Sequence, residues 1–223
     1  MIKNVLIDID NTLLDFNKSA DMAIKMGFSK FNLNYTDNTF ATFKTVNDEL
    51  WRKIERREIT RTILHEIRFD IIFQKLNIDF DGKTFEKQFL ENLNVCACHV
   101  DNAEEIMSYL SKKYNVYTAS NAPKEQQLKR LKISGLDRFV KKSFISQEIG
   151  FDKPDKRFFD ACFKEIDGEI DQAIFIGDSL SADIIGGINY GLKTVWFNFE
   201  AKENVGLKID YVIDNLLQLK SIL

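Results

Sequence analysis

The sequence has few of the residues that mark secreted, membrane or disulfide-stabilised proteins. Three cysteines in 223 residues are an odd number, and a chain of this length buries enough surface to fold without disulfides. Cys96, Cys98 and His99 lie close together, but no second Cys/His pair follows at zinc-ligand spacing. No apolar run approaches the roughly 20 residues of a membrane span, and Asp8 interrupts the short run Val5–Ile7, which excludes a signal-peptide core. We therefore expect a cytoplasmic protein with no membrane partner.

The charge balance and two missing motifs exclude further classes. Lys and Arg number 31 against 34 Asp and Glu, so a net charge of -3 offers no broad basic surface for a nucleic acid polymer. No glycine-rich phosphate loop follows a strand, since Gly186, Gly187 and Gly191 all lie in a helix-like segment. A G-x-S-x-G nucleophile elbow is also missing.

What the sequence does contain is an alternation of short apolar strands and helices. The predicted strands are 5–7, 114–120, 144–145, 173–177, 194–197 and 211–213. The predicted helices are 104–113, 124–133 with Pro123 in its first turn, 154–166, and one marked by Ile184, Ile185 and Ile188 and closed by Gly191. Such alternation predicts an α/β fold with a Rossmann-like parallel sheet covered by helices on both faces.

Residues 18–92 have a different pattern. Apolar residues recur there with helical spacing, as in Phe43, Val46, Leu50 and Ile54, and no strong strand is visible. We therefore predict an α/β core domain formed by residues 1–17 and 93–223, with an inserted all-helical domain at 18–92.

Polar residues gather where the predicted strands end. They are Asp8, Asp10, Ser120, Asn121, Asp178, the nearby Asp183, and Lys153 in a loop that leads into a helix. Each alone is an ordinary turn, cap or surface residue, but the carboxyl ends of parallel strands meet at one edge. Two carboxylates about 4 Å apart repel by roughly 4 kcal/mol at an effective dielectric near 20, so such a cluster needs a cation. Oxygen ligands without His or Cys favour Mg²⁺, and a lysine and a hydroxyl nearby favour a phosphate ligand.

These residues also resemble a known family. Asp8-Ile9-Asp10-Asn11-Thr12 resembles the D-x-D-x-T motif of the haloacid dehalogenase superfamily phosphatases. Ser120 resembles the second motif, Lys153-Pro154-Asp155 the third, and Gly177-Asp178 with Asp183 the fourth. Segments similar to the bacterial pyrimidine 5′-nucleotidase branch are Val46-Asn47, Leu50-Trp51, 150–156 and 183–191.

The resemblance implies a role for each acidic residue. Asp8 would attack phosphorus and form an aspartyl-phosphate, which is covalent catalysis. Asp10 would protonate the leaving alcohol and then deprotonate the attacking water. Mg²⁺ would be held by the Asp8 carboxylate, the Asp10 backbone carbonyl and Asp178. Asp183 would orient these ligands or Lys153.

The remaining motif residues would bind the phosphate. Ser120, the Asn121 amide and Lys153 would hold the phosphoryl oxygens as charge redistributes. Ala122 stands where family members often have glycine, which affects the fine geometry of this turn. Residues 18–92 would form a helical cap that excludes water and contacts the leaving group.

The predicted substrate is a small phosphate ester, a pyrimidine nucleoside 5′-monophosphate with deoxy forms accepted. Aromatic residues of the insert that could stack on a base are Phe40, Phe43, Trp51, Phe69 and Phe73. Alternatives within the enzyme class are a phosphatase of a sugar phosphate or phosphoglycolate, and a phosphomutase. The presence of Asp10 argues against a haloacid dehalogenase, because that reaction has no leaving oxygen for Asp10 to protonate.

Two further alternatives are not enzymes: a phospho-accepting receiver domain and an inert binding protein on the same fold. A receiver domain needs only about half this length and has no helical insert. Its acceptor aspartate ends a later strand, whereas Asp8 follows the first strand of this chain, so these features argue against a receiver. All the proposed catalytic residues are present, which argues against an inert protein.

Overall fold

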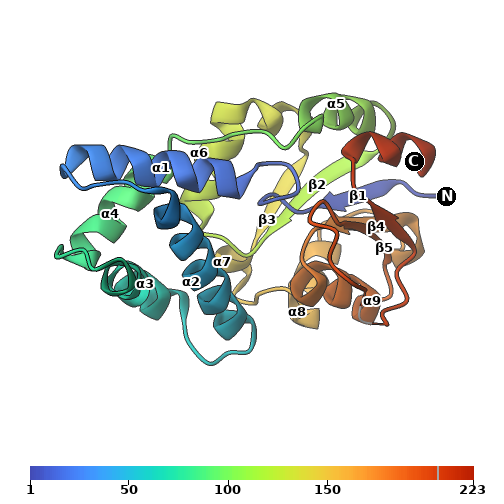
Figure 1. The fold of residues 1–223 in the computed structure, drawn as a ribbon. Helices are drawn as coiled ribbons and strands as arrows, with labels where there is room; N and C mark the ends of the chain where they lie inside the picture. The colour runs from blue at the N-terminus through green and yellow to red at the C-terminus, as the bar shows by residue number, and fades with distance from the viewer. Residues whose placement is uncertain (205) are drawn as a thin grey trace. The chain divides into compact units, whose positions relative to one another are not determined.

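The chain leaves one folded unit after residue 15 and returns to it at residue 97. The structure, a computed structural model, describes residues 1–204 and 206–223 (Figure 1). Residues 1–15 and 97–223 form the sheet unit, and residues 16–96 form the helical unit. The insertion predicted at 18–92 lies within the helical unit, which begins two residues earlier and ends four residues later.

The sheet unit alternates strands with helices. Its strands are β1 (Asn4–Ile7), β2 (Asn115–Ser120), β3 (Lys142–Ile145), β4 (Ala173–Gly177), β5 (Lys193–Phe197) and β6 (Tyr211–Ile213). Its α-helices are α5 (Ala103–Lys113), α6 (Lys124–Ser134), α7 (Ser146–Ile149), α8 (Lys156–Phe163) and α9 (Ile185–Tyr190). Shorter helical turns are η1 (Leu136–Phe139), η2 (Ile170–Gln172), η3 (Leu180–Ile184) and η4 (Leu216–Ser221). Among the described residues, no helix has both the length and the apolar character needed to cross a membrane.

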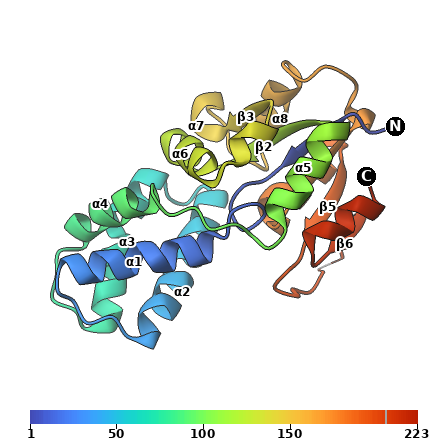
Figure 2. The same cartoon turned by 90° about the horizontal axis from the view of Figure 1, so that it is seen from above.

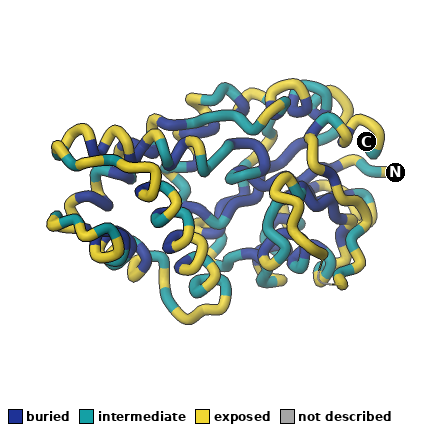
Figure 3. Tube along the Cα trace, in the orientation of Figure 1, coloured by how far each residue is buried: buried dark blue, intermediate teal, exposed yellow. Residues whose placement is uncertain are grey.

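The strands form a parallel sheet in the order β3-β2-β1-β4-β5-β6, which confirms the predicted fold class. Alternate side chains enter two separate cores. Val5 and Ile7 of β1 pack in the core that contains α5 and η4, and Leu6 packs in the core that contains α8. These helices lie on opposite faces of the sheet (Figures 1 and 2), and buried residues follow the central strands (Figure 3).

Two predicted helix starts differ from the structure. Pro123 is not in the first turn of α6 but precedes it, with an extended backbone. Pro154 likewise lies outside α8, because the Asp155 side chain accepts a hydrogen bond from the backbone N–H of Arg157 and caps the helix there. Helix α8 ends at Phe163, three residues before the predicted end.

The helical unit has a phenylalanine-rich core. Its helices are α1 (Phe16–Lys30), α2 (Asp37–Glu55), α3 (Arg61–Leu76) and α4 (Gly82–Leu93). Phe43, Phe69 and Phe73 are only 1–2% exposed and pack in this core, so the prediction that they could stack on a base is wrong. Rings at helical spacing fill the unit's own interior first. Phe40 and Trp51 are half-buried.

A buried ion pair joins three helices of this unit. The Arg68 guanidinium donates two hydrogen bonds to Glu86, at 3.0 and 2.5 Å, and one to Oδ1 of Asn47 at 2.8 Å. His65 Nδ1 lies 2.8 Å from the same carboxylate. Burial alone would raise the pKa of Glu86, but Arg68 and His65 outweigh it and lower this pKa. Asn47 of the nucleotidase-like segment therefore has a structural contact inside the unit.

Candidate active site

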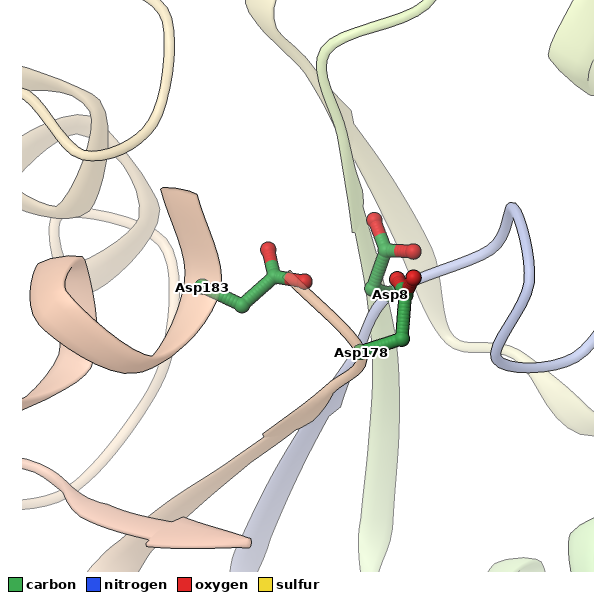
Figure 4. Close-up of side chains that lie close together, drawn as sticks. All are labelled: Asp8, Asp178 and Asp183. Atoms are coloured by element: carbon green, nitrogen blue, oxygen red, sulfur yellow. The ribbon is translucent and has the colours of Figure 1, made fainter. Parts of the chain in front are cut away.

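Three carboxylates meet at the carboxyl end of the sheet. Asp8 directly follows β1 and Asp178 directly follows β4, and these strands are neighbours paired at Ile7 and Ile176. Side-chain oxygens of Asp8, Asp178 and Asp183 all lie within 4.8 Å of one another. Figure 4 shows Asp183 pointing toward the other two from the helical turn η3. These three residues, the acidic cluster, lie where the strand order reverses around β1, a common ligand position in such sheets.

Lys153 supplies a positive charge beside the acidic cluster. Its Nζ donates to Asp8 Oδ1 at 2.7 Å and to the Ala119 carbonyl at 2.6 Å, and it lies 2.8 Å from Asp183 Oδ1. The side chain is only 2% exposed. A buried ammonium held by two carboxylates offsets one of the three negative charges of the ionised cluster, which leaves the cluster with a net negative charge.

The crowding of the cluster changes the acidity of its members. Burial raises the pKa of Asp8 to about 7, and the Lys153 charge opposes this shift while Asp183 adds to it. Burial and the neighbouring Asp8 and Asp183 raise the pKa of Asp178 well above its usual value. The two carboxylates keep the pKa of Lys153 above its usual value, despite the opposing effect of burial. A bound cation would reverse these carboxylate shifts.

Asp183 reaches the cluster because Gly177 leaves room for it. A Cβ atom built on Gly177 would lie 2.3 Å from Asp183 Oδ2, which is closer than any real contact. The same oxygen accepts a hydrogen bond from the Ser179 backbone N–H at 3.2 Å. Asp183 is 1% exposed, and its Oδ1 lies 2.8 Å from Lys153 Nζ.

The second motif lies at the end of β2. Ser120 is 2% exposed, and its Oγ accepts hydrogen bonds from the Ala122 backbone N–H at 3.1 Å and from Gln127 Nε2 at 2.9 Å. The Asn121 side chain exchanges two hydrogen bonds of 2.9 Å with the backbone of Lys153. The side chain of Asn121 thus fixes the backbone of Lys153 and the loop that contains it.

Two residues of α6 bind the side chain of Asp10. Arg130 Nη1 donates to Asp10 Oδ1 at 2.5 Å, and Gln127 Nε2 donates to Asp10 Oδ2. The Asp10 side chain is 25% exposed and that of Arg130 is 1% exposed. Neither Gln127 nor Arg130 belongs to the sequence motifs that predicted the site residues.

One signal in the sequence could have identified both residues. Helix α6 has few apolar residues, and Gln127 and Arg130 are spaced three apart, on one face of a helix that starts just after the second motif. The structure buries these two completely and leaves Leu128 and Ile133 41% and 55% exposed. Leu131 is the third buried residue of α6, so two of its three buried residues are polar, and buried polar residues of this kind point to a specific contact.

Comparison with known proteins finds a hydrolase family model and relatives named as hydrolases, nucleotidases or phosphatases. A family model described as haloacid dehalogenase-like hydrolase matches residues 2–191. A Bacillus subtilis protein named HAD-hydrolase YfnB is 34% identical over 204 residues, which cover 91% of this chain and 87% of that protein. The pyrimidine 5′-nucleotidase PynA of Streptococcus pneumoniae is 30% identical over 204 residues, 91% of this chain and 86% of PynA.

Two further similarities concern a third relative and a solved structure. A glyceraldehyde 3-phosphate phosphatase of Pyrococcus furiosus is 28% identical over 232 residues, 100% of this chain and 93% of that protein. The crystal structure of YfnB bound to magnesium matches with a TM-score of 0.94 at 34% identity, covering 99% of this chain and 98% of that one.

Proposed function

Because the chain belongs to the haloacid dehalogenase-like hydrolase family, we propose that it is a Mg²⁺-dependent phosphatase of small phosphate monoesters. The observation that carries this proposal is the acidic cluster, with the Lys153 ammonium bound to Asp8. An ammonium and a cation site beside one carboxylate suit an anionic substrate and a carboxylate nucleophile.

The residues of the cluster fit Mg²⁺. Their donors are all oxygens, two of the carboxylates are buried and one is half-buried, and the raised pKa values of Asp8 and Asp178 indicate that a positive charge is needed there. The Asp8 and Asp178 carboxylates and the Asp10 backbone carbonyl would hold the ion. When bound, Mg²⁺ offsets negative charge on the cluster and on the phosphate.

Asp8 is the proposed nucleophile. Lys153 holds one of its oxygens at 2.7 Å, which restricts the carboxylate to one orientation. One Asp8 oxygen would form the bond to phosphorus as the leaving oxygen departs, giving an aspartyl-phosphate that water then hydrolyses. Lys153, the Ser120 hydroxyl and the Asn121 backbone amide would hold the phosphoryl oxygens.

Asp10 is the proposed general acid and then general base. It would give its proton to the departing alcohol and take a proton from the water that attacks the aspartyl-phosphate. Its side chain is 25% exposed, so part of the carboxylate is accessible from outside the protein. The helical unit, inserted a few residues after Asp10, would cap the site and contact the leaving group.

The proposed substrates are pyrimidine nucleoside 5′-monophosphates, including deoxy forms. The similarity to PynA supports this class, and Trp51 and Phe40 are the remaining aromatic candidates for stacking on the base. A sugar phosphate is the second candidate, supported by the similarity to the Pyrococcus furiosus phosphatase. A phosphomutase would share the same chemistry at Asp8.

Phosphate release from a panel of esters tests the proposal. The panel is UMP, dUMP, dTMP, AMP, phosphoglycolate, a hexose phosphate and p-nitrophenyl phosphate, each with Mg²⁺ and with a chelator. We expect Mg²⁺-dependent release with the highest kcat/KM for a pyrimidine nucleotide. A tenfold preference for phosphoglycolate or the hexose phosphate would refute the substrate class and leave the phosphatase proposal intact. No release from any ester would refute both.

A further inference from the structure

We propose that helix α6 positions the side chain of Asp10 for proton transfer through Arg130 and Gln127. This inference rests on the proposed function, in which Asp10 is the general acid and base. Arg130 and Gln127 are positioning residues, because they act on the leaving group only through the Asp10 carboxylate.

The hydrogen bonds hold both oxygens of that carboxylate. Arg130 Nη1 donates to Oδ1 of Asp10 at 2.5 Å and to Oε1 of Gln127 at 3.2 Å. The Gln127 amide nitrogen donates to Oδ2 of Asp10 and, at 2.9 Å, to the Ser120 hydroxyl. A carboxylate held at both oxygens cannot rotate freely, so its orientation is set by α6.

The burial of α6 indicates that these contacts are not incidental. Gln127 and Arg130 are 0% exposed, while two apolar residues of the same helix, Leu128 and Ile133, are 41% and 55% exposed. A guanidinium is rarely fully buried without a partner, and burying it is favourable only with a well-placed opposite charge. Of the three apolar residues of α6 only Leu131 is buried, whereas a helix that served only packing would turn all of them inward.

The arrangement also links two parts of the candidate site. One amide group of Gln127 contacts both Asp10 and Ser120, so the proton-transfer group and a phosphate-binding hydroxyl share one rigid support. The proton must reach the leaving oxygen while the phosphoryl group is held, and small misplacements of either group lower the rate strongly.

Replacing Arg130 with methionine tests the role of the guanidinium. The test compares kcat/KM for the best alkyl phosphate of the panel, whose leaving group needs a proton, with kcat/KM for p-nitrophenyl phosphate, whose leaving group departs as the anion. We expect a loss of roughly 10- to 100-fold with the alkyl ester, within the total of about 10²–10⁴ that general acid–base catalysis contributes. With p-nitrophenyl phosphate we expect a loss below about threefold, and KM should change little for either ester.

The matched control is Arg138→Met, which removes an exposed arginine of the same unit that pairs with Glu104. It should leave both kcat/KM values within about twofold. Arg130→Lys keeps the charge on a shorter donor group and should restore part of the rate with the alkyl ester. If Arg130→Met does not fold, the kcat/KM values of Arg130→Lys and wild type are compared instead, again with the alkyl ester and with p-nitrophenyl phosphate.

A double-variant cycle with Asp10→Asn separates positioning from a general structural effect. Adding Arg130→Met to Asp10→Asn should change the single-turnover rate with the alkyl ester by less than about twofold, because the group that Arg130 positions is already disabled. Equal losses for both esters, the same loss in the Asp10→Asn background, or no loss at all would overturn the inference. The proposed function fails separately, if wild type releases no phosphate or Asp8→Asn retains activity.

Discussion

Replacing Asp8 with asparagine is expected to abolish turnover and also to make the metal-free protein more stable. Asparagine keeps the shape of the side chain and can still accept the hydrogen bond from Lys153, but it cannot act as the nucleophile. When ionised, the three carboxylates and Lys153 sum to a charge of −3 + 1 = −2, and the substitution reduces this to −1. A functional residue that lowers stability is typical of active sites.

The size of the effect follows from the cluster geometry and the pKa of Asp8. Like charges 4.8 Å apart repel by about 3 kcal/mol at an effective dielectric near 20. The pKa rise from 3.8 to about 7 is the net result after the attraction of Lys153. At about 1.4 kcal/mol per pKa unit, ionising Asp8 in the folded state costs on the order of 4 kcal/mol. For a chain of this length the gain corresponds to a Tm rise of about 8–16 °C.

The gain should depend on pH in a defined direction. Below the unfolded pKa of 3.8, Asp8 is protonated in both states, so its ionisation has no effect on stability. As pH rises toward about 7, the folded state retains the proton that the unfolded state releases, and the wild-type protein loses stability. The difference between Asp8→Asn and wild type should therefore grow between pH 4 and about 7 and then level off.

The assay is thermal unfolding in a chelator across this pH range, followed by the same scans with millimolar Mg²⁺. Mg²⁺ should raise the Tm of wild type and have much less effect on Asp8→Asn, because one ligand is lost. Asp214→Asn is the control, since it removes an exposed aspartate that directly follows β6. A lower Tm for Asp8→Asn than for wild type in chelator at pH 8 would refute the electrostatic reasoning. Retention of more than a few per cent of activity would refute the nucleophile assignment.

Three further outcomes are expected. Chelation should abolish activity, and Asp178→Ala should raise the Mg²⁺ concentration needed for half-maximal rate or eliminate the rate; full activity after exhaustive chelation would contradict the metal site. Glu86→Gln should destabilise the helical unit by about 3–5 kcal/mol in denaturant titration, because Arg68 stays buried without its counter-charge; an unchanged midpoint would contradict this. Trp51→Ala should lower kcat/KM for a pyrimidine nucleotide by roughly 5- to 150-fold and leave p-nitrophenyl phosphate nearly unaffected, whereas equal losses would indicate a structural role for Trp51.

The sequence alone was sufficient for the fold class and for the identity of the acidic cluster. Buried parallel strands leave short apolar runs that end in polar residues, and this pattern is local, so it can be read without the structure. Asp8 and Asp178 were predicted to converge because their strands end at the same edge, and the structure places their side chains within 4.8 Å. Their catalytic roles and that of Asp183 remain predictions.

Only the tertiary structure determined which polar side chains hold one another. Arg130 and Asp10 are 120 positions apart in the chain, and Lys153 and Asp8 are 145 apart, so no local pattern reports either contact. The spacing of Phe43 and Phe69 predicted helices correctly, but a phenylalanine in a core and one beside a ligand have the same spacing. Burial depends on how elements pack, and packing brings together residues from distant segments. The sequence therefore determined which groups are available for chemistry, and the folded chain decided which partners orient them.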